Sequence, residues 1–153
     1  MTEIADEKSN PFTQYYAQLL HQGNMLQDLT RTGTYRHAFV SNAVDFHDKV
    51  VLDVGTGTGI LAIFACQAGA RKVYAVEASQ SAEIARLLIQ ANGYSDRIEV
   101  IQAKLEDVQL PEKVDIIISE PIGFLLGKMI VCFQLKDLFS CQYDPLGSDT
   151  VIL

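Results

Sequence analysis

The stretch VVLDVGTGTGILAIFA, residues 50–65, predicts a buried strand joined to a helix by a loop of three glycines. Its first five residues are nearly all apolar, as in a strand covered on both faces. Gly55, Gly57 and Gly59 follow, and an apolar helical run comes after them. Ligands of open parallel sheets bind outside the carboxyl ends of the strands, so bare backbone here predicts a bound ligand. A tight turn without a ligand is the alternative interpretation of the glycines alone.

Strand and helix patterns alternate along the chain beyond this loop. Short apolar runs typical of buried strands are separated by longer amphipathic runs that end near glycines. This alternation is typical of parallel βαβ units, and it predicts an α/β fold. The expected strands are 50–54, 72–76, 97–103 and 114–119, and the expected helices are 59–68 and 79–92.

The segment before the first strand shows helical periodicity. Apolar residues recur at helical spacing from Phe12 to Leu29. The run TRTGTY then interrupts the pattern, and Gly33 is typical of a helix end or a turn. We therefore expect one helix before this run and a second, short helix within residues 34–46.

Composition excludes several classes of protein. The chain has 153 residues and a net charge of −7, which argues against a non-specific nucleic-acid binder. It has no apolar run long enough to span a membrane and no apolar signal segment near its start. The three cysteines, Cys66, Cys132 and Cys141, lack metal-ligand spacing. Reduced thiols, an intracellular location and no metal are expected.

Acidic residues follow the second and third predicted strands. Glu77 ends the strand at 72–76, where a carboxylate can accept hydrogen bonds from both hydroxyls of a ribose. Glu106 and Asp107 follow the third strand, where one of them can accept from the amine of an adenine. Each acid alone can equally be a solvated surface residue. Together with the glycines they indicate adenosine without a pyrophosphate, and S-adenosylmethionine fits better than a dinucleotide. Asp53 could then meet the ammonium of its methionine part.

Four segments of the chain carry a family resemblance. NMLQDLTRTGTYRHAF, DKVVLDVGTGTGIL, QAGARKVYAVEAS and DRIEVIQAKLEDVQLPEKVDIIISEPIGFLL occur in this order between residues 24 and 126. The chain resembles the protein arginine methyltransferases, in their coactivator-associated, asymmetric-dimethylating branch, over residues 12–126. The resemblance implies a Rossmann-like three-layer αβα sandwich that binds S-adenosylmethionine, with an N-terminal helical lid.

The resemblance also implies a set of cofactor-binding residues. Arg31 would pair with the methionine carboxylate of the cofactor, because an arginine can bind a carboxylate through two parallel hydrogen bonds. Glu77 would hold the ribose and Glu106 the adenine. The full set is Tyr16, Gln22, Met25, Arg31, Asp53, Gly55, Thr56, Gly57, Glu77, Ala78 and Glu106.

Glu120, in the run SEP, matches the first acid of the family's double-glutamate loop. A guanidinium is a planar cation with five donors and no acceptor. Two carboxylates facing it can orient it and localise electron density on the nitrogen that receives the methyl group. Glu120 is therefore the expected catalytic residue, acting by positioning and electrostatics.

The chain departs from the family after residue 126. The second glutamate is expected nine residues after Glu120, where this chain has Met129. The family's catalytic histidine, substrate-groove barrel and dimerisation arm have no counterpart in the following residues. KMIVCFQL or DTVIL could supply a substitute strand. The expected divisions are a lid at 1–46, a cofactor domain at 47–126 and a divergent tail at 127–153.

The resemblance implies methyl transfer to arginine in proteins such as histones, impaired in this truncated chain. The alternatives are an inactive fragment that binds the cofactor or a partner, a product that hardly folds, and a small-molecule methyltransferase. The expected partner is an arginine-containing, histone-like protein, with neither nucleic acid nor membrane bound. The family forms homodimers, and the expected locations are the nucleus and cytoplasm.

Overall fold

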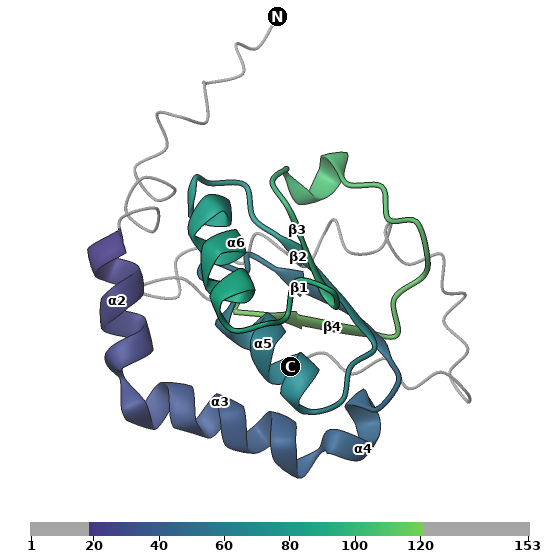
Figure 1. Ribbon diagram of the computed structural model, residues 1–153, viewed down its shortest axis with the longest axis horizontal. Helices are drawn as coiled ribbons and strands as arrows, with labels where there is room; N and C mark the ends of the chain where they lie inside the picture. The colour runs from purple at the N-terminus through teal and green to yellow at the C-terminus, as the bar shows by residue number, and fades with distance from the viewer. Residues whose placement is uncertain (1–18, 121–153) are drawn as a thin grey trace, which may run out of the picture.

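A four-stranded parallel sheet forms the centre of the structure, a computed structural model that describes residues 19–120 (Figure 1). The strand order is β3-β2-β1-β4, so β1 lies between β2 and β4. The elements in chain order are α2 (Leu19–Gln27), α3 (Leu29–Ser41), α4 (Ala43–Phe46), β1 (Val50–Val54), α5 (Ile60–Gln67), β2 (Lys72–Val76), α6 (Ser81–Ala91), β3 (Ile98–Ile101), the 3₁₀ turn η2 (Leu105–Asp107) and β4 (Ile116–Ser119).

The sheet is buried on both faces, as its apolar strands predict. Every residue of β1 and β4 is buried, because alternating side chains face opposite layers. In β1, Val51 pairs with Val73 of β2 on one side and with Ile116 of β4 on the other. The predicted α/β fold with a parallel sheet is confirmed.

Helices cover one face of the sheet. Val51, Val73 and Ile118 belong to a core that also contains buried residues of α5 and α6. The N-terminal helices join the same core, because Phe39 of α3 stacks on Phe46 of α4 at 4.8 Å between ring centroids. Figure 1 shows α2 and α3 running around the outside of α5 and α6. The N-terminal segment is therefore packed on the sheet domain through α3 and α4.

The opposite face of the sheet is covered differently. Leu52, Tyr74 and Ile117 point to this side, where Val108 and partly buried residues of the segment 101–114 pack on them. Within residues 19–120 the cover on this face thus comes from η2 and its flanking loop. The third layer of the expected sandwich is represented here by that segment.

The predicted interruption around Gly33 is wrong. Helix α3 runs through Gly33 without a break, and the chain instead changes direction at Asp28, between α2 and α3. Asp28 caps α3, since its side-chain oxygen accepts a hydrogen bond from the N–H of Arg31 at 3.0 Å. Capping by Asp28 and the burial of Phe39 therefore outweigh the low helix propensity of glycine.

The other boundaries agree closely with the predicted ones. β1 and β2 have the expected bounds, α5 and α6 are shorter by one or two residues at each end, and β3 and β4 are shorter than expected. Among the described residues, no helix is long and apolar enough to cross a membrane. The substitute strands expected in the tail lie outside the described residues.

Candidate functional site: the carboxyl edge of the sheet

The glycine loop lies at the carboxyl ends of β1 and β2. The N–H groups of Gly55 and Thr56 both donate to the carbonyl of Val76, at 2.9 and 3.1 Å, which ties the loop to the end of β2. Gly55 is exposed, and a side chain added there would meet no atom of residues 19–120 within 4 Å. Among the described residues, open space therefore lies against the backbone at Gly55, as binding of a flat or extended ligand requires.

Glu77 faces this loop from the end of β2. One carboxylate oxygen accepts from the N–H of Gly57 and the other from the N–H of Ser79, both at 2.9 Å. An ionised carboxylate has about four acceptor positions, so the hydroxyls of a ribose can still donate to it. The side chain is half-buried and held in place before any ligand arrives.

Helix α2 reaches the same loop through Gln22. This glutamine is buried, and its Oε1 lies 2.9 Å from the position that a Cβ on Gly57 would occupy. Gly57 also has a φ of +57°, a conformation that side chains rarely adopt. A larger residue would therefore strain the loop, and the amide end of Gln22 would have to shift.

Asp53 lies under the loop and is 1% exposed. It accepts a hydrogen bond from the hydroxyl of Thr56 at 2.6 Å and another from the backbone N–H of Ala62. Burial raises the pKa of Asp53 to about 7, and the negative charges of Glu77 and Glu120 contribute to the rise. Asp53 thus holds the loop in place through Thr56. A pKa of about 7 means that its carboxyl gains or loses a proton near neutral pH.

Glu120 follows β4 and joins a cluster with two residues of α3. Its carboxylate forms an ion pair with Nη2 of Arg31 and a hydrogen bond with Tyr35. The guanidinium of Arg31 also lies over the ring of Tyr35, 5.4 Å from its centroid. Burial, together with the hydrogen bond to Glu120, raises the pKa of Tyr35 to about 12. We name Arg31, Tyr35 and Glu120 the carboxyl-edge cluster.

The remaining predicted residues have fewer contacts with the site. Met25 contributes its backbone carbonyl, which accepts from Nη1 of Arg31 at 3.4 Å. Ala78 is exposed beside Glu77, and Glu106 is exposed on η2. Within residues 19–120, Glu106 makes no hydrogen bond or ion pair with the other predicted residues. Tyr16 lies outside the described residues.

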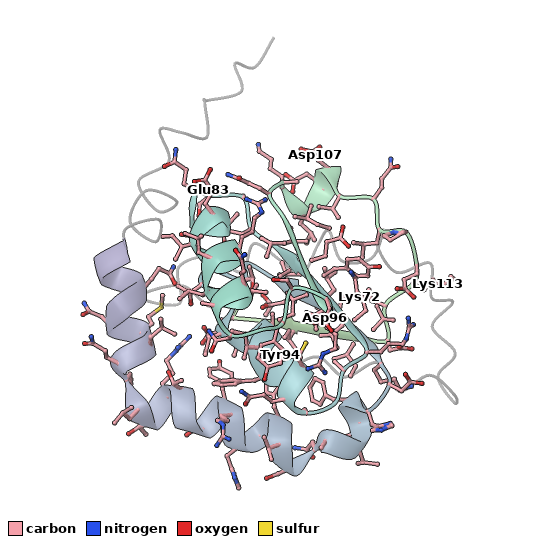
Figure 2. All side chains as sticks on the ribbon, viewed as in Figure 1. Lys72, Glu83, Tyr94, Asp96, Asp107 and Lys113 are labelled. Atoms are coloured by element: carbon pink, nitrogen blue, oxygen red, sulfur yellow. The ribbon has the colours of Figure 1, made fainter. Side chains whose placement is uncertain are left out.

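The exposed acids near this edge can be followed in Figure 2. Glu83 at the start of α6 and Asp107 on η2 lie at the same end of the molecule, whereas Lys72 and Lys113 lie away from it. Within residues 19–120, no group of three or more metal-binding side chains is close enough to hold a metal ion. Cys66 is buried and not in a disulfide, and burial raises the pKa of its thiol to about 11.

Sequence reasoning did not assign Tyr35 to the site. Its only signal is its place in TRTGTY, four residues after Arg31, which puts the two side chains on one face of a helix. That spacing becomes informative only if Gly33 is placed inside the helix. The contact with Glu120 joins residues that are far apart in the chain, and no local pattern reports it.

Comparisons with known proteins agree on methyl transfer. A family model described as ribosomal protein L11 methyltransferase (PrmA) matches residues 38–133, more than half of the chain. The histone-arginine methyltransferase CARMER of Drosophila erecta is 53% identical over 121 residues, which are 79% of this chain and 23% of that protein. The probable histone-arginine methyltransferase CARMER of Drosophila melanogaster matches to the same extent.

Solved structures show the same relationship. Arabidopsis thaliana protein arginine methyltransferase 10 superposes with a TM-score of 0.72 at 52% identity, over 75% of this chain and 33% of that one. The PRMT1 enzyme–prozyme complex of Trypanosoma brucei, determined with AdoHcy, gives a TM-score of 0.69 at 53% identity, over 72% of this chain and 35% of that one.

This chain spans about a quarter of the length of the curated relatives that it matches. The family model and the relatives differ in the substrates that they name, and the identity of 53% supports the finer assignment. The chain belongs to the methyltransferases and, within them, to the protein arginine methyltransferases, of which it spans one part.

Proposed function

We propose that this chain binds S-adenosylmethionine at the carboxyl edge of the sheet and serves methyl transfer to arginine side chains of proteins. The observation that carries the proposal is the placement of Glu77, whose carboxylate faces the glycine loop and is held by two backbone N–H groups. Half of its acceptor capacity stays available for a ribose. A structural neighbour determined with AdoHcy supports the same class of ligand.

The residues of this edge fit the parts of the cofactor. Gly55 leaves room against the backbone, Glu77 would accept from the ribose hydroxyls, and Arg31 would offer a cation to the carboxylate. Gln22 brings α2 over the loop and the carbonyl of Met25 accepts from Arg31, so residues 1–46 would act as the lid. Asp53, Thr56 and Ala78 complete the predicted set, with Glu106 at the adenine. When bound, the cofactor supplies a methyl group on a sulfonium.

Glu120 would act on the protein substrate. Its carboxylate can hold the planar guanidinium of an arginine and draw positive charge away from the nitrogen that accepts the methyl group. Relatives named histone-arginine methyltransferases support histone-like substrates and a nuclear location for this chain. A homodimer is the assembly that the family implies.

A second candidate function is cofactor binding without transfer. Met129 stands nine residues after Glu120, where the family has a second glutamate, and an apolar thioether cannot pair with a guanidinium. In that reading the chain holds the cofactor or a partner protein and does not turn over.

Two measurements test these proposals in turn. Calorimetric titration with S-adenosylhomocysteine should give saturable heat, and absence of heat at millimolar ligand would contradict cofactor binding. Radiolabel transfer from S-adenosylmethionine to an Arg-Gly peptide then separates the candidates, with Glu120→Gln as the matched control. Counts that Glu120→Gln abolishes support transfer. Binding without counts supports the second candidate.

A further inference from the structure

The carboxylate proposed to receive the substrate already holds a guanidinium of this chain. Nη2 of Arg31 pairs with Glu120, and Nη1 of the same arginine donates to the carbonyl of Met25 at 3.4 Å. The ring of Tyr35 supports the guanidinium from one side, at 5.4 Å. Among residues 19–120, the guanidinium of Arg31 therefore has three partners, which are Glu120 and two residues of the N-terminal helices.

Arg31 and a substrate arginine would offer Glu120 the same chemical group. A carboxylate binds one guanidinium well through two parallel hydrogen bonds, and a second one then finds fewer acceptor positions. One acceptor position of Glu120 is also used by Tyr35. Occupation by Arg31 therefore competes with a substrate guanidinium at this residue.

The charges around the site suggest what removes Arg31. The charges of Glu77 and Glu120 both act on the buried carboxyl of Asp53, so this edge is already acidic and a ligand carboxylate that enters it needs a cation as its partner. Arg31 is that cation next to Glu120, and its side chain is 24% exposed, so a ligand can reach it. The methionine part of the proposed cofactor carries such a carboxylate.

We propose that Arg31 is exchanged between Glu120 and the carboxylate of the cofactor, so that cofactor binding frees Glu120 for the substrate. Tyr35 keeps its hydrogen bond and holds Glu120 in place after Arg31 leaves. This inference rests on the proposed function, because it needs a carboxylate-bearing nucleoside. The coupling is reciprocal, since the factor by which the Arg31–Glu120 pair weakens cofactor binding is the factor by which bound cofactor weakens the pair.

The test compares two nucleosides that differ in the carboxylate. S-adenosylhomocysteine carries the amino-acid group, and 5′-methylthioadenosine lacks it. In the Glu120→Gln variant the hold on Arg31 weakens, so affinity for S-adenosylhomocysteine should rise about two- to fivefold, as expected for a partly exposed ion pair. Affinity for 5′-methylthioadenosine should stay unchanged, which also shows that the variant is folded at the site.

Two further variants separate the exchange from a simple charge effect. Glu120→Asp keeps the negative charge but shortens the side chain, and it should also raise affinity for S-adenosylhomocysteine. In an Arg31→Gln background, Glu120→Gln should give no gain. A gain that persists there reflects charge alone and overturns the proposal.

The remaining outcomes are equally decisive. Unchanged or lower affinity for S-adenosylhomocysteine in both Glu120 variants would mean that Glu120 holds Arg31 ready for the cofactor, which is the opposite of exchange. Failure of the unaltered chain to bind either nucleoside would instead contradict the proposed function itself.

Discussion

Two clusters built from the same three residue types lie at opposite ends of the sheet. The carboxyl-edge cluster joins Arg31, Tyr35 and Glu120. The second, which we name the amino-edge cluster, joins Arg71, Tyr74 and Glu112. In it Glu112 accepts from Nη2 of Arg71 and from the hydroxyl of Tyr74, both at 3.0 Å. In each cluster burial and a glutamate raise the pKa of the tyrosine to about 12.

The two clusters differ in what they connect. Tyr74 is 2% exposed in the core, and Glu112 belongs to the segment that covers the second face of the sheet. The amino-edge cluster thus fastens that segment to β2. The carboxyl-edge cluster connects α3 to the end of β4, beside a loop with open space. The two clusters share their residue types, so the position at the carboxyl edge of the sheet is what makes the first a candidate site, whereas the second has a structural role.

The largest expected effect is a loss of ligand affinity from a substitution at the carboxyl edge, with no loss from the same substitution at the amino edge. Glu77→Gln replaces one carboxylate oxygen by an amide and removes the charge, so affinity for S-adenosylhomocysteine should fall about 10- to 100-fold. The same change at the other end, Glu112→Gln, should leave affinity unchanged. Calorimetry on both variants checks this, and a comparable loss in Glu112→Gln would erase the distinction.

The next effect concerns the pH dependence of stability at the carboxyl edge. Because the pKa of Asp53 is raised from 3.8 to about 7 on folding, the folded state binds a proton more tightly there. The stability gained from this proton is fully present below pH about 4 and is lost as the pH rises through about 7.

Asp53→Asn keeps an acceptor for Thr56 and removes this titration. From pH 5 to pH 8 the unaltered chain should therefore lose on the order of 2–3 kcal/mol of unfolding free energy that Asp53→Asn does not lose. Urea denaturation at the two pH values measures it. A difference that does not change with pH would show that Asp53 stays ionised.

A smaller effect should mark the amino edge as structural. Tyr74→Phe removes a buried hydroxyl that donates to Glu112, which should cost about 1 kcal/mol of unfolding free energy without changing nucleoside affinity. Tyr35→Phe, the matched change at the other end, should cost less stability, because Tyr35 is only partly buried. Chemical denaturation of Tyr74→Phe and Tyr35→Phe measures both costs. A larger loss of stability in Tyr35→Phe would contradict the comparison.

The smallest effect is expected for Arg71→Gln. Arg71 is exposed, so its ion pair with Glu112 is screened by solvent and contributes less than the hydroxyl of Tyr74. Any stability difference from the unaltered chain should vanish in 1 M salt. Denaturation curves at low and high salt provide the check, and a loss that survives high salt would assign Arg71 a packing role.

Much of the fold could be predicted because local patterns and packing agree there. The apolar runs of β1 and β2 are bounded by glycines and charged residues, and both strands have the expected limits. β4 starts later than expected, at Ile116. The carboxylate of Asp115 accepts from the N–H of Val50 at 2.8 Å, a side-chain contact that an apolar pattern does not report.

The candidate site was predictable only in part, for a related reason. The carboxylate of Glu77 contacts the glycine loop, and this contact could be predicted because parallel strands end at the same edge of a sheet. The pairing of Arg31 with Glu120 spans 89 residues and depends on how α3 packs. Arg31 was predicted at a cofactor carboxylate, and the structure places it on a carboxylate of the protein itself.

Gly33 has a consequence for the helix that carries Arg31 and Tyr35. It lies midway between them, and no atom of the part of the chain that the structure describes is within 4 Å of where a methyl group would be, so packing among those residues does not require a glycine. Inside a helix it lowers stability by about 0.5–1 kcal/mol relative to alanine. That turn is therefore easier to open than its neighbours, and its amide protons should exchange with solvent sooner. Local opening of this turn would let Arg31 move while Tyr35 keeps its contact with Glu120.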